Sequence, residues 1–436
     1  MGPNLSLRIL FVVPYAPTRI RTRPLNLIKS LVSAGHRITL ATLWSDEEEL
    51  QAIRSLNGEL ENLIAEKIPA TRKIWNCLQA LPGRKPIQAF YSWNPRLAER
   101  IARAVRTQHF DIIHVEHLRG AKYALLLNET GLTQGRKHIP LVWDSVDCIS
   151  ELFSRALRQS HTFRARRTAG FELGRTQKFE GWLANQFERT LVTSESDRQG
   201  LLRLAEKQNH KCRPESKIPI QERITVVPNG VDLSYFSPSD ESREPQTLVI
   251  TGKMSYHANI TAVVRFVREI MPKIWAELPQ TSLWIVGKDP SPEIRKLGTS
   301  KIVEETGDCD GRETPKSRIH VTGTVKDIRP YLRKATLAVA PIRYAAGIQN
   351  KVLEAMACGT PVVATREAVG DIRACPGKDL LVAQNGQELA QSILALLKNR
   401  KLRTGLGHAG RTFTESNHDW QKIARELTLI YENACS

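Results

Sequence analysis

The sequence predicts an α/β protein made of two successive domains, each with a parallel β-sheet. Its 436 residues exceed what one ordinary hydrophobic core organises, so two domains are expected. Short runs rich in β-branched residues alternate with longer amphipathic segments, which is typical of β-α-β units. This alternation restarts after a polar break at 237–246. We therefore expect domains at 1–225 and 226–415 with a cleft between them, and a final helical segment, 416–436, that returns to the first domain.

In the first half, each expected strand is a short apolar run followed by an amphipathic segment. The strands are expected at 7–13, 37–42, 111–115, 140–143 and 189–193. A helix at 25–34 follows the first strand, and Gly35 and His36 end it.

The second half repeats this pattern. Its strands are expected at 247–251, 282–286, 319–322, 337–340 and 361–364. Helices are expected at 260–278 and 350–357, and a closing helix at 419–433. The polar segment 304–317 is expected to be a surface loop.

The composition narrows the class of protein. A net charge of +18 suits nucleic acid, an anionic membrane surface or a phosphorylated substrate. No basic stripe is interleaved with aromatic residues, which ranks nucleic acid last. No apolar run approaches the roughly 20 residues of a membrane span, and 9–13 is too short for a leader peptide. The seven scattered cysteines show no paired metal-ligand spacing, so we expect a reduced, cytoplasmic protein without structural zinc.

The segment 347–361 carries the clearest chemical signal. Gly347 lies in a turn between a strand and a helix, at the strand edge where parallel sheets bind ligands. The backbone N–H groups at the helix start suit a diphosphate. Glu354, further along the helix, can accept hydrogen bonds from a ribose diol. The alternative is a plain β-α unit with an exposed glutamate.

The chain resembles the retaining glycosyltransferases of family four, which have the GT-B fold. The resemblance covers nearly the whole length and rests on the order of several motifs, which occupy 111–114, 227–232, 283–287, 321–323 and 347–355. It implies two Rossmann-like domains that face each other across a cleft. It also implies metal-independent sugar transfer, with retention, from a nucleotide-diphosphate sugar, and we favour a UDP-sugar over a GDP- or ADP-sugar. The segment beginning Gly347-Ile-Gln-Asn-Lys looks closest to the branch that serves bacterial exopolysaccharide synthesis.

The resemblance implies a donor site in the second domain. Lys253 follows the Gly252 turn, where its ammonium could neutralise a departing diphosphate, and we assign it a catalytic role. The other donor-binding candidates are Gly252, Val325, Gly347, Ile348, Gln349, Asn350, Lys351 and Glu354. Two positions depart from the pattern of many relatives: Ala346 replaces a glutamate that contacts the donor sugar, and Ala258 replaces a lysine that grips the diphosphate.

In the first domain, Glu116 and His117 follow a strand at the expected cleft, and either is a candidate for contact with the reacting sugar. Asp144 and Asp147 end the next strand, with helix N-capping as the alternative role. The weaker acceptor or phosphate candidates are Arg19, Arg21, Arg23 and Asp144. For the arginines the alternative is a solvated basic loop.

Other functions remain open at this stage. A sugar-nucleotide epimerase can use the same fold, and Ala346 makes a catalytically altered binding subunit conceivable. The pair Asp308 and Asp310 looks like a metal motif, but it follows no apolar strand, so no metal site is expected.

The expected acceptor is a hydroxyl on a lipid-linked or growing cell-envelope glycan, because many members of the resembling family use such acceptors. The segment 155–178 contains seven basic residues and one acidic residue, Glu172. We therefore expect a cytoplasmic protein that binds an anionic membrane surface peripherally, on its inner face. The alternative for this segment is a mobile basic loop.

Overall fold

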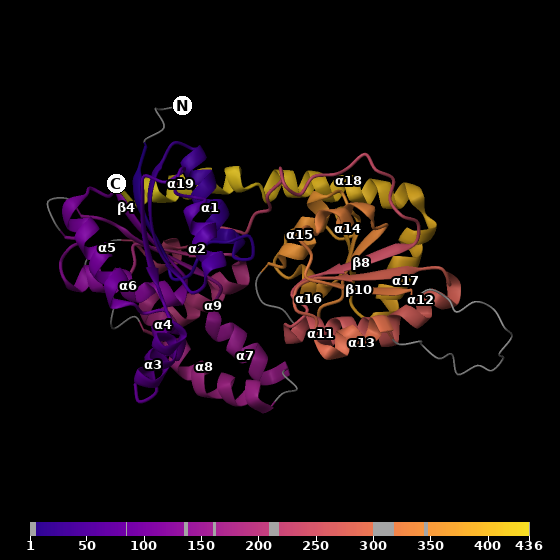
Figure 1. The fold of residues 1–436 in the computed structure, drawn as a ribbon, viewed down its shortest axis with the longest axis horizontal. Coiled ribbons are helices and arrows are strands. Elements are labelled where there is room, and N and C mark those ends of the chain that lie inside the picture. The colour runs from indigo at the N-terminus through magenta and orange to yellow at the C-terminus, as the bar shows by residue number, and fades with distance from the viewer. Residues whose placement is uncertain are drawn as a thin grey trace. The chain divides into compact units, whose positions relative to one another are not determined.

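The computed structural model describes residues 6–83, 85–134, 138–159, 163–208, 218–299, 318–343 and 348–435. The chain forms two compact units (Figure 1). Unit 1 contains Met1–Asn229 together with Trp420–Ser436, and unit 2 contains Gly230–Asp419. The division lies within a few residues of the domain limits expected from the sequence, and the C-terminal helix belongs to unit 1.

Unit 1 is built on a parallel sheet with strand order β3-β2-β1-β4-β5-β6-β7. The strands are β1 (Arg8–Val13), β2 (Arg37–Trp44), β3 (Asn62–Lys67), β4 (Ile112–Glu116), β5 (Leu141–Val146), β6 (Arg189–Val192) and β7 (Ile224–Val226). The five expected strands are confirmed, whereas β3 and β7 were not expected. Both are edge strands that are only partly buried, so their sequences lack a long apolar run.

Helices cover both faces of this sheet. They are α1 (Thr22–Ser33), α2 (Glu47–Arg54), α3 (Ala70–Ala80), α4 (Ile87–Tyr91), α5 (Pro95–Thr107), α6 (His117–Glu129), α7 (Ile149–Gln159), α8 (Phe163–Ala184), α9 (Glu195–Glu206), α10 (Ile220–Arg223) and α19 (Trp420–Cys435). On one face, α1 and α19 pack side by side against alternate residues of β1 such as Ile9 and Phe11 (Figure 1). The C-terminal helix thereby supplies part of the unit 1 core. The basic segment 155–178 falls within α7 and α8 and is helical where it is described, which rules out the loop alternative there.

Unit 2 contains a second parallel sheet, in the order β10-β9-β8-β11-β12-β13. The strands are β8 (Thr247–Thr251), β9 (Ser282–Val286), β10 (Ile319–Gly323), β11 (Leu337–Ala340), β12 (Val362–Thr365) and β13 (Leu381–Ala383). All but β13 match the expectation. The helices are α11 (His257–Arg265), α12 (Met271–Glu277), α13 (Pro292–Thr299), α14 (Arg329–Lys334), α15 (Asn350–Ala357), α16 (Arg366–Val369), α17 (Gly386–Lys398) and α18 (Arg400–Asn417). The expected surface loop at 304–317 lies outside the described residues.

The helix expected at 260–278 is divided into α11 and α12 by a π-helical turn, Phe266–Ile270. Pro272 stands in the first turn of α12. A proline has no N–H to give to the preceding turn, so a continuous α-helix would lose a hydrogen bond here. The wider turn accommodates the proline at a helix start, where that N–H is not needed.

Candidate functional site

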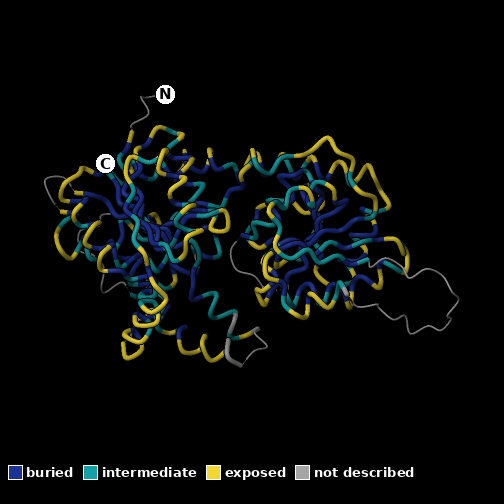
Figure 2. Tube along the Cα trace, in the orientation of Figure 1, coloured by how far each residue is buried: buried dark blue, intermediate teal, exposed yellow. Residues whose placement is uncertain are grey.

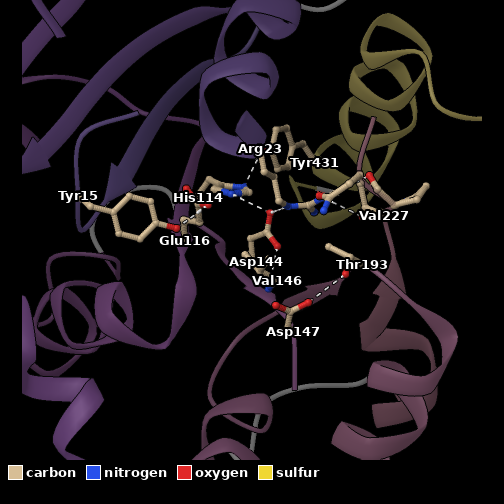
Figure 3. Close-up of polar contacts among 12 residues, drawn as sticks. Tyr15, Arg23, His114, Glu116, Asp144, Val146, Asp147, Thr193, Val227 and Tyr431 are labelled. Carbon is tan, nitrogen blue, oxygen red and sulfur yellow. Dashed lines mark hydrogen bonds and ion pairs between the residues drawn. The ribbon is translucent and has the colours of Figure 1, made fainter. Parts of the chain in front are cut away.

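The carboxyl ends of β4 and β5 bring a cluster of polar side chains together inside unit 1 (Figure 3). His114 and Glu116 come from β4 and Asp144 from β5, and all three are almost completely buried. Adjacent parallel strands end at the same edge of a sheet, which is why these residues meet. Buried polar groups cost free energy unless they are paired, so each one indicates a partner or a ligand.

Arg23 forms the central ion pair of this cluster. Its Nε lies 2.8 Å from Oδ2 of Asp144, and both side chains are buried. A terminal nitrogen of Arg23 also donates to the carbonyl oxygens of Val227 (3.0 Å) and Pro228 (3.2 Å) and to Oδ1 of Asn229 (3.1 Å). The structure therefore places Arg23 in an internal bracing role, unlike the open phosphate-binding loop that the sequence suggested.

The other two arginines of that loop are exposed. Arg21 pairs with Glu49 at 2.9 Å, and its guanidinium lies 4.8 Å from the ring centroid of Tyr15. Arg19 is exposed as well. The structure thus separates Arg19 and Arg21, which are accessible to an anion, from Arg23, which is not.

His114 connects the cluster to the C-terminal helix. Its Nδ1 lies 2.7 Å from the hydroxyl of Tyr431 in α19, and its Nε2 lies 3.7 Å from Asp144. Burial lowers the pKa of His114 to about 4, so the ring is neutral near pH 7. Sequence reasoning missed Tyr431. The sequence feature that could have indicated it is a tyrosine on the apolar side of the C-terminal helix. The hydroxyl of a buried tyrosine needs a hydrogen-bond partner.

Glu116 has unused bonding capacity, as do the second terminal nitrogen of Arg23 and Nε2 of His114, which also lack a hydrogen-bond partner among the described residues. The Tyr15 hydroxyl donates to its Oε1 at 2.9 Å, whereas its buried Oε2 has no hydrogen-bond partner among the described residues. Burial raises the pKa of Glu116 to about 8, and the negative charge of Asp144 adds to the rise. The carboxyl is therefore protonated near pH 7 and can donate a hydrogen bond. An unpaired buried oxygen with a shifted pKa is typical of a ligand-binding position.

Two strained residues lie at the carboxyl ends of β4 and β5. His117 begins α6 with φ of +61°, and Val146 has φ of +68° in a β-bulge that lies after Asp144. Positive φ is uncommon for any residue except glycine and is an outlier for a β-branched one. Such strain concentrates at functional sites, so both positions support a site at this edge of the sheet.

The two aspartates that the sequence singled out, Asp144 and Asp147, lie on either side of Val146 in this bulge. Oδ1 of Asp144 accepts a hydrogen bond from the backbone of Val146 at 3.1 Å, and Asp147 accepts one from the Thr193 hydroxyl at 3.3 Å. Burial and the nearby Asp197 raise the pKa of Asp147 to about 6. Asp144 thus supports a strand bulge and an ion pair, and the helix-capping alternative does not apply to it.

In unit 2, the loops after β8 and β9 approach each other closely. A Cβ atom on Gly287 would lie 1.7 Å from the carbonyl oxygen of Gly252, so only glycine fits there. A Cβ atom on Gly252 would lie 3.1 Å from Nζ of Lys351. Gly287 therefore permits the close approach of the two loops, and Gly252 leaves room for the ammonium group of Lys351 beside the end of β8.

Hydrogen bonds link Lys351 on α15 to Lys253 after β8, through Asn259 on α11. Lys351 on α15 donates from Nζ to Oδ1 of Asn259 at 2.7 Å, and the Asn259 amide donates to the carbonyl of Lys253 at 2.8 Å. Burial lowers the pKa of Lys351 to about 8. Asn259 was not singled out from the sequence. The sequence feature that could have indicated Asn259 is its position directly after Ala258, which is one of the two departures from the family pattern.

Glu354 lies one helical turn beyond Lys351 on α15 and is half-buried. Burial raises the pKa of its carboxyl to about 7, and the positive charge of Lys351 opposes the rise. The structure thus brings Gly252, Lys253, Lys351 and Glu354 to one edge of the unit 2 sheet.

The remaining donor-site candidates are less informative. Ala346 and Gly347 lie outside the described residues. Ile348 is buried, Gln349 stands at the N-cap position of α15 without a side-chain capping hydrogen bond, Asn350 begins that helix, and Val325 packs against the unit 2 core.

The sequence predicted no metal site. The suspected pair Asp308 and Asp310 lies outside the described residues. In the part of the chain that the structure describes, no group of three or more His, Cys, Asp or Glu side chains is arranged to hold a metal ion. No described helix is long and apolar enough to cross a membrane.

Similarity to solved structures supports the fold. Sucrose-phosphate synthase from Thermosynechococcus elongatus superposes with a TM-score of 0.65 at 17% sequence identity, covering 98% of each chain. Anabaena HepE, solved in complex with UDP and glucose, gives a TM-score of 0.61 at 13% identity, covering 98% of this chain and 100% of HepE. At these identities the likeness establishes the two-domain GT-B fold.

Similarity in sequence identifies the family. Residues 21–235 match the family described as Glycosyltransferase Family 4, and residues 245–399 match Glycosyl transferases group 1. The phosphatidyl-myo-inositol mannosyltransferase of Mycolicibacterium smegmatis is 26% identical over 217 residues, which are 47% of this chain and 51% of that enzyme. The aligned region thus spans about half of this relative's length. Because the two family matches follow the two units in order and together span most of the sequence, the chain belongs to the family 4 glycosyltransferases.

Proposed function

We propose that the protein transfers a sugar, with retention, from a nucleoside-diphosphate sugar to a hydroxyl acceptor. The observation that carries this proposal is the grouping at the strand edge of unit 2, where Lys253 and Lys351 flank a glycine turn and Glu354 lies one turn further along. Two ammonium groups beside an open backbone turn suit a diphosphate, and a carboxylate suits a ribose diol.

Many relatives carry a diphosphate-binding lysine at the position of Ala258. In this chain Lys351 takes over that role. Its pKa is lowered to about 8 because burial desolvates its ammonium, and the negative charge of Glu354 only partly opposes this effect. A diphosphate would supply the missing negative charge and restore full protonation. Stabilising the charge on the leaving diphosphate in this way lowers the barrier for sugar transfer.

The unit 1 cluster is proposed to contact the sugar that reacts. Protonated Glu116 offers a neutral hydrogen-bond donor, and strained His117 lies beside it at the start of α6. Attack by the acceptor hydroxyl on the same face that the diphosphate leaves would give retention, with the diphosphate as the base. The protein then positions the reactants and stabilises charge.

The acceptor that we propose is a lipid-linked or growing glycan of the cell envelope or an exopolysaccharide, and we propose that the protein acts in the cytoplasm at the inner face of the membrane. The similarity to the phosphatidyl-myo-inositol mannosyltransferase of Mycolicibacterium smegmatis supports a lipid acceptor. The HepE complex with UDP supports a UDP-sugar as donor.

The test is incubation with UDP-, GDP- and ADP-sugars, followed by measurement of released nucleotide and of the sugar nucleotide that remains. Release of one nucleoside diphosphate that increases with added acceptor supports transfer. Conversion of the sugar without release would identify an epimerase, and binding without either reaction would identify a binding subunit.

Glu354→Ala is expected to weaken nucleoside-diphosphate binding by about 1.5–3 kcal/mol, because charge-assisted hydrogen bonds to the ribose are lost. Calorimetry on wild type and variant measures this difference. Unchanged affinity in a folded variant would remove Glu354 from the site.

The pH dependence of nucleoside-diphosphate binding gives a second test of the role assigned to Glu354. Wild-type affinity should rise as pH increases through about 7, where Glu354 loses its proton, and fall above about 8, where Lys351 loses its charge. Glu354→Gln should abolish the rise at lower pH and keep the fall at higher pH.

Turnover is expected to continue after divalent metal is removed, because the two lysines take the place of a metal at the diphosphate. Dialysed enzyme assayed in excess EDTA should keep most of its activity. Loss of activity that manganese or magnesium restores would contradict a metal-independent mechanism.

A further inference from the structure

Exposed apolar side chains gather on one helix of unit 1. Nine large hydrophobic residues are exposed in the described parts of the chain, and four of them belong to α3 or the residue after it. Ile74, Trp75 and Leu78 are 62%, 54% and 53% exposed, and Leu81 is exposed as well. Their spacing places them along one side of the helix. Figure 2 shows the exposed trace at α3, at the lower end of unit 1 as drawn.

A fifth exposed hydrophobic residue, Phe171 on α8, extends this surface. Arg175 on α8 donates to the carbonyl of Leu81 at 3.2 Å, and its guanidinium lies 4.0 Å from the ring centroid of Phe171. Glu172 accepts a hydrogen bond from the backbone of Ile87 at 2.9 Å. The two helices are therefore joined, and we call Ile74, Trp75, Leu78, Leu81 and Phe171 the α3 face.

The charges around the α3 face have one sign. The sequence contains no aspartate or glutamate between Lys67 and Glu99. On α8, Glu172 and Glu180 are buried. The exposed charged residues of this rim are basic and include Lys85, Arg166, Arg167 and Lys178. An apolar centre with a basic rim is the pattern of a protein that lies in the interface of an anionic bilayer.

An apolar cavity of about 280 Å³ opens beneath the same helix. It is lined by Ala70, Lys73, Ile74, Cys77, Leu78 and Tyr91. Ile74 and Leu78 belong both to this lining and to the α3 face, so the cavity is continuous with the exposed surface. On the far side of the lining, the guanidinium of Arg119 lies 5.0 Å from the Tyr91 ring centroid. Arg119 follows His117 by two residues, which connects the cavity to the candidate site of unit 1.

We propose that the α3 face docks unit 1 on an anionic bilayer, with Trp75 and Leu78 inserted in the interface and hydrocarbon entering the cavity beneath. The exposed basic residues of α8, Arg166, Arg167 and Lys178, then supply part of the rim, and the apolar contact comes from α3. A second copy of this chain is a poorer occupant, because the basic rims of two copies would oppose each other. The entry of an acceptor's hydrocarbon chain rests on the proposed function, whereas the docking itself does not.

The test is co-sedimentation with vesicles of equal parts phosphatidylglycerol and phosphatidylcholine, compared with phosphatidylcholine alone. Wild type should sediment with the mixed vesicles, and added salt should weaken this binding. Trp75→Gln with Leu78→Gln should lower the partition coefficient by about tenfold or more, because both inserted side chains are lost. The matched control is Leu402→Gln with Leu429→Gln, two exposed leucines elsewhere, which should bind as wild type does.

Insertion has a spectroscopic signature of its own. Brominated phospholipid should quench part of the wild-type tryptophan fluorescence, and Trp75→Phe should remove that part while vesicle binding persists. Equal sedimentation on neutral and mixed vesicles, or equal binding by the α3 and control variants, would overturn the proposal. A wild-type dimer in solution that becomes monomeric in the α3 variant would assign the face to self-association instead. Nucleotide release with donor and water alone should be the same in all variants, so a failure of docking remains distinct from a failure of the proposed function.

Discussion

Asp144→Ala is expected to destabilise unit 1 by about 3–5 kcal/mol, because it leaves the buried guanidinium of Arg23 without its anionic partner. The same change removes the carboxylate nearest to His114. Native-state hydrogen exchange in β4 and β5 measures the effect within unit 1, separately from unit 2.

Asp147→Ala is the matched control, since Asp147 directly follows the same strand and has no ion pair of this kind. Burial raises the pKa of Asp147 to about 6, so its removal should cost about 1 kcal/mol or less. Replacing both ion-pair partners, as Arg23→Met with Asp144→Leu, should recover much of the lost stability, because no unpaired charge remains buried. Equal losses for the two aspartates would show that the ion pair does not determine the stability of this edge.

Glu116→Ala is expected to lower turnover by about 10²–10³-fold, as the loss of one hydrogen-bond donor near developing charge does in other enzymes. Glu116→Gln should retain most of the activity, because an amide N–H replaces the protonated carboxyl as donor. Glucosyl or mannosyl transfer from the preferred donor, measured at saturating substrate, gives the comparison. The control is Glu129→Gln, which changes an exposed glutamate on α6 and should leave turnover unchanged.

The pH profile of these variants separates a donor role from a base role. Wild-type activity should fall as pH rises through about 8, where Glu116 loses its proton, and Glu116→Gln should lack this fall. Because the folded pKa exceeds the ordinary value of 4.5, the stability that the neutral carboxyl provides is present below that value and is lost as pH rises through about 8. The Gln variant should therefore also be the more stable protein above that pH. A Gln variant as inactive as the Ala variant would favour proton abstraction by Glu116.

Local sequence patterns determined the two-domain parallel fold. Apolar β-branched runs gave the central strands, and β8 and β9 have the expected bounds, because a buried parallel strand is apolar along its whole length. The short, partly polar strands β3, β7 and β13 carry no such signal. The segment beginning at Gly347 also pointed to Lys351 and Glu354, and residues three apart on a helix lie on the same side whatever the tertiary structure.

Only the tertiary structure decided which distant side chains meet. His114 and Tyr431 are 317 residues apart in the chain, and Arg23 and Asp144 are 121 apart. Their contacts depend on strand order and on the return of α19 to the unit 1 sheet, which periodicity does not encode. The apolar stripe of α3 is a similar case. Periodicity shows that a helix has an apolar side, but burial depends on whether another element covers it, and α3 leaves that side in water.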